Sequence, residues 1–382
     1  MIYVQHLLGI GHLMRARLLA EAIAELGCEV HLVSGGMPIG GRMPRGVRTV
    51  QLPPIRVSDA SFTPLRDAEF TPIDDAYRER RRALLLAAFA EAAPAAVLFE
   101  TFPFGRRALH FELFPLLEHI DATRPRPLVI GSVREILQLQ QKPEREREML
   151  DWAARWFDAI FVHGDRRFAR FEDTFSFVAE LVPPVHYTGF VMERPVQPRA
   201  QEDATRTEVV VSAGGGGVGI ELLATALAAQ PHSRFRHLTG RVLVGPNIPE
   251  TGMQRLRASA ASNAIVERSR ADFADVLRNA YVSVSQAGYN TTLDVIGSGA
   301  RPVIVPFTGR GETEQRARGE RLRHFGLAVV VDDRSLSPAS LADAVDEAAA
   351  RTAWGNWDFA SDGAASTASL LVDMLAAPGR VA

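Results

Sequence analysis

Strand and helix patterns alternate along this sequence of 382 residues, and the alternation starts twice. The first start is a short apolar strand at 2–6, a glycine turn, and a helix at 13–26. The second is a strand at 208–212, a run of glycines and a helix at 220–229. Between them, residues 192–207 are rich in proline and charge without an apolar period, which is typical of a linker. Repeated βα order implies parallel sheets covered on both faces, so we predict an α/β protein with two Rossmann-like domains.

The expected domain boundaries follow from this restart. We expect an N-terminal domain over residues 1–191, the linker over 192–207 and a C-terminal domain over 208–362. The final segment, 363–382, contains a helix with no sheet partner of its own, and we expect it to pack back across the domain junction. Ligands of such sheets bind beyond the carboxyl ends of the strands, so we expect the two glycine turns to face a shared cleft.

The composition narrows the classes of protein that fit. With 47% hydrophobic residues, 23% charged residues and a formal net charge of -2, the chain resembles an ordinary soluble globular protein and not a disordered or nucleic-acid-binding one. A single cysteine, Cys28, excludes an internal disulfide. The most apolar long stretch, 83–99, contains Glu91 and Pro94 and is shorter than the roughly 20 residues of a membrane-spanning helix. We therefore predict a cytoplasmic protein, and peripheral contact with a membrane surface stays open.

Residues 283–318 contain the strongest sequence signal for a ligand-binding site. An apolar strand leads into Gly288, after which a helix begins. A helix that starts at a glycine turn presents unpaired backbone N–H groups and the positive end of its dipole, which suits a phosphate. Asn290 or Thr291 could cap this helix or bond a phosphate oxygen, and Asp294, one turn further on the same face, could hydrogen-bond a ribose. Polar side chains after the next strand would then contact an attached sugar. The pattern favours a nucleotide diphosphate sugar as ligand.

A second glycine turn, at 214–219, contains the spacing G-x-G-x-x-G between a strand and a helix. Glycines allow a backbone to approach a pyrophosphate closely, and the helix start adds N–H donors. The same spacing is used to bind NAD, but no clear acidic residue ends a strand about 20 residues later, as an NAD site requires. We therefore expect no cofactor, and a purely structural turn is the remaining alternative.

His12 lies in the first turn of the first helix. Near a helix N-terminus the protonated imidazole is disfavoured, so His12 is expected to stay neutral and to accept a proton. A histidine that only caps its helix is the alternative. Polar residues that follow other strands of the first half, among them Glu100 and Arg134, could line an acceptor pocket. The sequence contains no Cys/His cluster, HExxH or Asp-x-Asp motif, so we expect no catalytic metal.

At these residues the chain resembles the GT-B glycosyltransferases of the bacterial group, family 28-like, that includes the peptidoglycan-precursor N-acetylglucosaminyltransferase. The resemblance extends from Gly9 to about Ala348. The chain resembles a poorly characterised branch of bacterial glycosyltransferases even more closely. The motifs shared with that branch are Gly9-Ile10-Gly11-His12, Val33-Ser34-Gly35-Gly36, Phe102-Pro103-Phe104-Gly105, Tyr187-Thr188-Gly189, Gly245-Pro246-Asn247 and Gln286-Ala287-Gly288-Tyr289-Asn290-Thr291.

The resemblance implies roles for individual positions. Thr291 falls where the family contacts the donor diphosphate, and Asp294 falls where a Glu binds the ribose. Glu314–Gln315 occupies the place of a Gln-Gln pair that hydrogen-bonds the donor sugar, and His12 matches a histidine suspected of acting near the acceptor. Gly216 replaces a diphosphate-binding Ser, so any contact there must come from the backbone. Because Glu replaces the first Gln and the preceding loop is one residue longer, the donor sugar stays open.

Together with these patterns, the resemblance implies an inverting, metal-independent glycosyltransferase. It would move a sugar from a nucleotide sugar, by resemblance a UDP-sugar, to a hydroxyl of a small-molecule, glycan or lipid-linked acceptor, with His12 or Glu100 as the base. The alternatives are a nucleotide-sugar hydrolase of the nonulosonic acid pathway type and a non-catalytic nucleotide-sugar-binding subunit. The donor-binding candidates are Gly214, Gly215, Gly216, Gly217, Gly219, Ser285, Gly288, Tyr289, Asn290, Thr291, Thr292, Asp294, Glu314 and Gln315. The acceptor-side candidates are Gly11, Arg15, Phe104 and Arg134.

Overall fold

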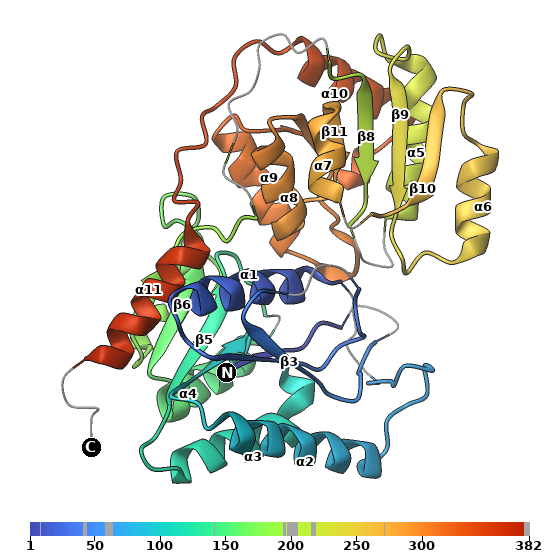
Figure 1. The fold of residues 1–382 in the computed structure, drawn as a ribbon. Coiled ribbons are helices and arrows are strands. Elements are labelled where there is room, and N and C mark those ends of the chain that lie inside the picture. Colours follow the sequence, from blue (N-terminus) through green and yellow to red (C-terminus); the bar gives the residue numbers. More distant parts are fainter. Residues whose placement is uncertain are drawn as a thin grey trace. The chain divides into compact units, whose positions relative to one another are not determined.

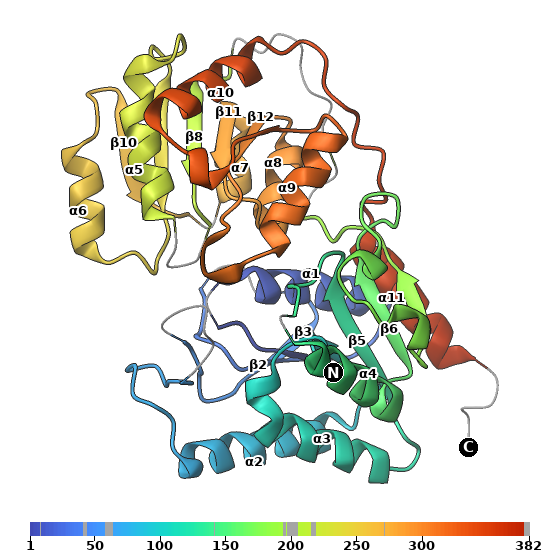
Figure 2. The ribbon, with the colours of Figure 1, turned by 180° about the vertical axis from the view of Figure 1, so that it is seen from behind.

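The chain divides into two compact units, Met1–Val191 with Phe359–Ala382, and Met192–Asp358 (Figure 1, Figure 2). The computed structural model describes residues 1–7, 9–40, 44–57, 64–140, 142–193, 196, 205–214, 219–270 and 272–377.

The first unit is built on a parallel seven-stranded sheet in the order β3-β2-β1-β4-β5-β6-β7. Its strands are β1 (Ile2–Val4), β2 (Val30–Ser34), β3 (Val47–Gln51), β4 (Ala96–Glu100), β5 (Leu128–Arg134), β6 (Ala159–His163) and β7 (Val185–Tyr187). Strands β1, β2, β4 and β6 are buried along their whole length, as expected for apolar runs in a parallel sheet covered on both faces. The chain moves outward from β1 to β3 on one side and from β4 to β7 on the other. The topological switch point therefore lies between β1 and β4.

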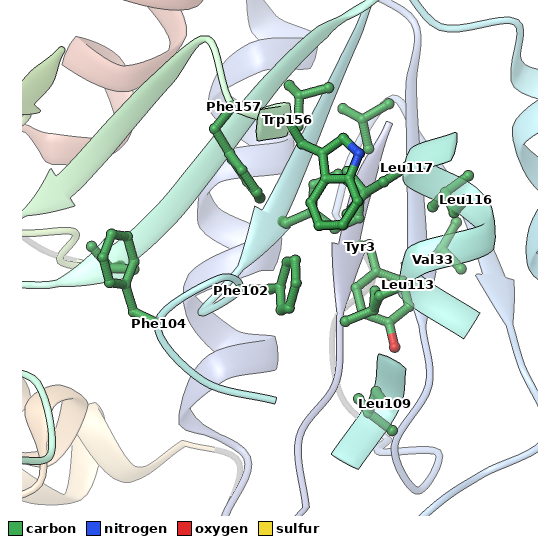
Figure 3. Close-up of a cluster of buried hydrophobic side chains, with 14 of the residues drawn as sticks. Tyr3, Val33, Phe102, Phe104, Leu109, Leu113, Leu116, Leu117, Trp156 and Phe157 are labelled. Carbon is green, nitrogen blue, oxygen red and sulfur yellow. The ribbon is translucent and has the colours of Figure 1, made fainter. Parts of the chain in front are cut away.

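Helices cover both faces of this sheet. They are α1 (Gly11–Glu25), α2 (Asp75–Ala92), α3 (His110–Ala122), α4 (Pro143–Trp156) and α11 (Gly363–Ala376), with short 3₁₀ helices at Arg107–Leu109, Phe171–Asp173 and Val178–Glu180. On one face, Leu19 of α1 and Leu371 of α11 belong to the same apolar cluster. On the other face, α2, α3 and α4 enclose a large core that includes Tyr3, Phe102 and Trp156 (Figure 3).

A buried ion pair fixes the loops at the end of β1. Arg81 of α2 and Glu112 of α3 are both fully buried and lie 2.7 Å apart. Arg81 also donates to Gln5 Oε1 at 3.0 Å and to the carbonyl of Gly35 at 3.0 Å. Tyr3 donates from its hydroxyl to Glu112 Oε1 at 2.5 Å. Because each charge is paired and hydrogen-bonded, the pair can be buried, and it ties two helices to the turns that follow β1 and β2.

The second unit is built on a parallel six-stranded sheet in the order β10-β9-β8-β11-β12-β13. Its strands are β8 (Glu208–Ser212), β9 (Thr239–Val244), β10 (Ala264–Arg268), β11 (Ala280–Ser285), β12 (Arg301–Ile304) and β13 (Val329–Val330). The chain again moves outward in both directions from two central strands, so the switch point lies between β8 and β11.

Helices cover this second sheet in the same way. They are α5 (Ile220–Ala229), α6 (Glu250–Ala258), α7 (Phe273–Arg278), α8 (Tyr289–Ser298), α9 (Glu314–His324) and α10 (Pro338–Ala350), with 3₁₀ helices at Gln230–His232, Gly309–Gly311 and Asp333–Ser335. Residues of α5, α6 and α10 form one apolar cluster with the sheet, and residues of α7 and α8 form another on its other face. The predicted α/β class with two parallel sheets is confirmed. None of the helices in the described parts of the chain combines the length and apolar content that a membrane span needs.

Candidate functional site

At the switch point of the first unit, His12 contacts the end of β4. His12 is the second residue of α1, whose N-cap, Ile10, makes no side-chain cap hydrogen bond in the described structure. The imidazole Nδ1 lies 2.8 Å from Oε1 of Glu100, the last residue of β4. Thr101 Oγ1 lies 3.1 Å from the same nitrogen. The two candidates for the base, His12 and Glu100, are therefore in direct contact with each other.

The contacts of the ring nitrogens determine which nitrogen of His12 carries the proton. Arg134 Nη2 lies 2.5 Å from His12 Nε2. A guanidinium can only donate, so Nε2 accepts, and the ring proton lies on Nδ1, from which it is donated to Glu100. Burial, followed by the charge of Arg134, lowers the pKa of His12 well below its usual 6.5. The imidazole is therefore neutral at neutral pH, and its Nε2 lone pair faces the Arg134 guanidinium.

Glu100 is buried and receives donors on both oxygens. Arg15 donates to Oε1, and Ser132 donates to Oε2 at 3.0 Å. Ser132 Oγ lies 2.8 Å from His163 Nε2, and His163 Nδ1 lies 2.9 Å from Thr188 Oγ1. Because the Ser132 proton goes to Glu100, His163 must donate from Nε2 and accept from Thr188. The hydrogen bonds from Thr188 to His163, from His163 to Ser132 and from Ser132 to Glu100 thus all donate in the direction of Glu100, which stabilises its carboxylate. Burial and the nearby Arg15 lower the pKa of His163 to about 3, so this ring is neutral as well.

The other residues that the sequence suggested for an acceptor pocket are placed differently. Phe104 is buried, and its ring packs edge-on against Phe171 and Phe175 with centroids 5.1 Å apart, so it belongs to the core. Gly11 opens α1 and can offer only its backbone. Arg106 donates to the carbonyl of Gln5 at 2.8 Å, and burial, followed by the charge of Arg134, lowers its pKa to about 10.

At the switch point of the second unit, two helices begin at glycine turns after neighbouring strands. α5 has Gly219 as N-cap, at φ +113°, and α8 has Gly288. Glycine has no side chain, so neither N-cap residue can itself cap the first N–H groups of its helix. A Cβ built at Gly214 or at Gly288 would lie 3.9 or 4.0 Å from Thr291 Oγ1, so this hydroxyl lies close to both turns. The Thr291 hydroxyl thus lies close to Gly214, which follows β8, and to the start of α8, and each helix start offers backbone N–H groups. The candidates Gly215, Gly216 and Gly217 lie outside the described residues.

The remaining candidates of this turn lie in β11 and α8. Ser285 ends β11 and Thr292 lies in the first turn of α8; both are buried, and their hydroxyls have no hydrogen-bond partner among the described residues. Tyr289 is buried as well, whereas Asn290 and Asp294 are half-buried. The structure therefore brings the candidates at 285–294 together around one helix start.

Glu314 and Gln315 open α9 and make contacts inside the unit. Glu314 Oε1 lies 3.1 Å from Arg318 Nη1. Gln315 Oε1 lies 3.1 Å from the backbone N of Ala287 and 3.1 Å from that of Phe307. Sequence reasoning missed Arg318, although its place four residues after Glu314 is the spacing of a helical ion pair.

Within the described residues, no group of three or more His, Cys, Asp and Glu side chains could hold a metal ion. Independence from metal therefore stays a prediction for experiment.

The family match to known proteins falls in the second unit. Residues 209–353 match the family described as "Glycosyltransferase family 28 C-terminal domain". A UDP-N-acetylglucosamine--N-acetylmuramyl-(pentapeptide) pyrophosphoryl-undecaprenol N-acetylglucosamine transferase of Thermotoga neapolitana is 25% identical over 182 residues, which is 47% of this chain and 50% of that protein. The chain thus spans about half the length of the curated relative that it matches.

Solved structures are similar along the whole chain. MurG of Acinetobacter baumannii has a TM-score of 0.55 at 15% identity, covering 98% of this chain and 99% of its own. The calicheamicin glycosyltransferase CalG4 has a TM-score of 0.56 at 16% identity, covering 99% and 94%. At these identities the likeness concerns the fold. The chain therefore has the GT-B fold of these glycosyltransferases, and residues 209–353 of its second unit match a family 28 C-terminal domain.

Proposed function

We propose that this protein is a glycosyltransferase that moves a sugar from a UDP-sugar to an acceptor hydroxyl, with inversion at the anomeric carbon. The observation that supports this most directly is the start of α8, where the Thr291 hydroxyl lies close to Gly214 after β8, in a unit matched by a family 28 C-terminal domain. The matched relative of Thermotoga neapolitana is named for a uridine nucleotide sugar, which favours UDP as the leaving group.

The donor is proposed to bind the second unit. Its diphosphate would accept hydrogen bonds from the first N–H groups of α5 and α8 and from the Thr291 hydroxyl. Asp294, one turn along α8, would accept from the ribose hydroxyls. As the glycosidic bond breaks, negative charge grows on the diphosphate, and oriented N–H groups stabilise this charge more than they stabilise the bound donor.

The base is proposed to be His12 Nε2, with Glu100 as the group that orients it. The acceptor oxygen attacks the anomeric carbon from the face opposite the diphosphate, and the acceptor proton passes to Nε2. The bond from the anomeric carbon to the diphosphate oxygen breaks, and UDP leaves with the electron pair. One displacement inverts the configuration. Glu100, already bonded to Nδ1–H, stabilises the imidazolium that forms. Arg134 must leave Nε2 before this transfer, because its guanidinium occupies the same lone pair.

Ligand-induced thermal stabilisation tests the donor assignment. UDP and UDP-sugars should raise the melting temperature of the protein, because they bind only the native state. Asp294→Ala should remove most of that shift. NAD as the sole stabilising ligand, with every nucleoside diphosphate inactive, would contradict the proposal.

Turnover tests the base. His12→Ala should lower turnover by about a hundred-fold to ten-thousand-fold, the usual contribution of a general base, and should leave UDP affinity unchanged. Activity should survive EDTA. Product analysis separates transfer from hydrolysis, since a hydrolase would release free sugar from the donor whether or not an acceptor is present.

A further inference from the structure

Two side chains of α9 hold the backbone of a single residue, Ala287, next to the start of α8. Gln315 Oε1 accepts from the backbone N–H of Ala287 at 3.1 Å. Arg318 Nη1 donates to the carbonyl oxygen of Ala287 at 2.9 Å. Ala287 directly precedes Gly288, the N-cap of α8. Both backbone polar groups of Ala287 are therefore bonded to side chains of another helix.

The amide oxygen of Gln315 also joins two loops. Besides the N–H of Ala287 it accepts the N–H of Phe307, which lies in the loop after β12, at 3.1 Å. Backbone N–H groups can only donate, so the side-chain atom that faces both of them must be the oxygen. A carbonyl oxygen has two lone pairs, and both are used. Oε1 therefore has no lone pair left for a hydroxyl of a donor sugar.

Arg318 is fixed by several contacts as well. Its side chain is 2% exposed, and Nη1 lies 3.1 Å from Glu314 Oε1. The guanidinium carbon lies 5.6 Å from the ring centroid of Tyr289, the first residue of α8. A hydrogen bond from a buried, ion-paired guanidinium is among the stronger ones in proteins, so the Ala287 carbonyl has little freedom to turn.

We propose that Gln315 and Arg318 are positioning residues of the diphosphate site, which fix the two peptide units that flank Ala287 and thereby the direction of the first N–H groups of α8. The inference rests on the proposed function, in which those N–H groups bind the donor diphosphate. Donors that are oriented before the ligand arrives lose no freedom on binding, which raises affinity. For Gln315 this role differs from the sugar contact that the family resemblance implies, because Gln315 acts on the phosphates through Ala287.

The test compares Gln315→Met, which removes the acceptor oxygen at similar length, with Arg316→Met, which removes an exposed arginine from the same turn. In the free protein, amide hydrogen exchange over residues 286–296 should become about ten-fold faster in Gln315→Met, as expected for a lost hydrogen bond, and stay unchanged in Arg316→Met. The dissociation constant for UDP should rise by about ten-fold in Gln315→Met, whereas that for uridine, which has no phosphate, should change by less than about two-fold. Arg318→Met should act in the same direction. If Gln315→Met fails to fold, Gln315→Asn keeps an amide that is too short to reach both loops.

The possible outcomes separate the positioning role from the alternatives. Gln315→Met protein that binds UDP like the parent but binds UDP-N-acetylglucosamine or UDP-glucose more weakly would show a sugar contact and overturn the positioning role. Unchanged exchange over 286–296 would overturn it too, whatever the binding results. Faster exchange with unchanged UDP affinity would mean that the Ala287 contacts do not serve phosphate binding. If the parent protein binds no nucleoside diphosphate, the proposed function itself fails, and the positioning role fails with it.

Discussion

At the scale of single residues, the two neighbours of the His12 ring decide its chemistry. Glu100 accepts from Nδ1 and Arg134 donates to Nε2, so the tautomer follows from which neighbours can only accept and which can only donate. A neutral His12 was predicted from the helix start alone. In the structure, burial and the charge of Arg134 are the main causes of its lowered pKa. No spacing in the sequence could connect residues 12 and 134, because the contact exists only once β1 and β5 lie in one sheet.

Replacing Arg134 should therefore change the titration of His12. Arg134→Gln removes a positive charge that disfavours the imidazolium, so the pKa of His12 should rise, while burial still keeps it below 6.5. The fall in turnover on the acid side should move to higher pH by the same amount. Titration of the His12 resonances by NMR measures the pKa directly. Arg107→Gln, at an exposed arginine paired with Glu148, is the control and should leave it unchanged. An unchanged pKa in Arg134→Gln would mean that the guanidinium does not act on Nε2 in solution.

At the scale of helices and strands, the long, strongly patterned elements could be predicted and the edge strands could not. The sequence pattern predicted β8 and α5 with the bounds that the structure has. It missed β3, whose side chains are mostly exposed, and β7, which has three half-buried residues. Short edge strands show neither a full apolar run nor a clean alternation. Arg81 and Glu112 would likewise be expected on solvated helix faces, and only their pairing explains why both are buried.

The loop that leads into α9 should make the stability of the protein depend on pH through Glu312. Its carboxylate accepts from the backbone N–H of Gln315, but burial and the nearby Glu314 raise its pKa from 4.5 to about 7. The native state thus favours the protonated form. The protonated Glu312 carboxyl therefore adds to the free energy of unfolding. This addition is complete below pH 4.5 and is lost as the pH rises through about 7. Glu312→Gln should therefore unfold at higher urea than the parent at pH 8, by on the order of 2 kcal/mol, with a difference that shrinks toward pH 5.

The control for Glu312→Gln is Glu320→Gln, at an exposed carboxylate of α9, the helix that follows this loop. Its effect on unfolding should stay within about 0.5 kcal/mol at every pH, as is usual for a surface pair. A Glu312→Gln protein that is less stable than the parent at pH 8 would show that the ionised carboxylate helps the fold through its backbone contacts.

At the scale of the whole molecule, each unit places its candidates at the switch point of its own sheet. This placement could be predicted from the βα order, because ligands of doubly wound sheets bind where the strand order reverses. The partners within each site could not be predicted in the same way. Ser132 reaches Glu100 because the two residues are register partners on β5 and β4. His163 of β6 and Thr188, which follows β7, extend this chain of hydrogen bonds beyond Ser132. Register is set by the packing of the complete sheet, and local sequence does not specify it.

The division into two units makes a prediction about unfolding, because α11 is far from the first unit in sequence but packs within it. Phe190 N donates to Ala360 O at 2.8 Å and Gly363 N donates to Phe190 O at 3.0 Å, and Leu371 is buried in the cluster that includes α1.

A chain of two units should unfold in two calorimetric transitions, and UDP should raise the midpoint temperature of only the transition that belongs to the second unit. Leu371→Ala should destabilise the other transition by about 2–5 kcal/mol, the usual cost of removing a buried leucine side chain. Ser369→Ala, on the exposed side of α11, should leave both transitions in place. If Leu371→Ala instead lowers the transition that UDP raises, α11 contributes its stability to the second unit, and the division of the chain drawn above is wrong.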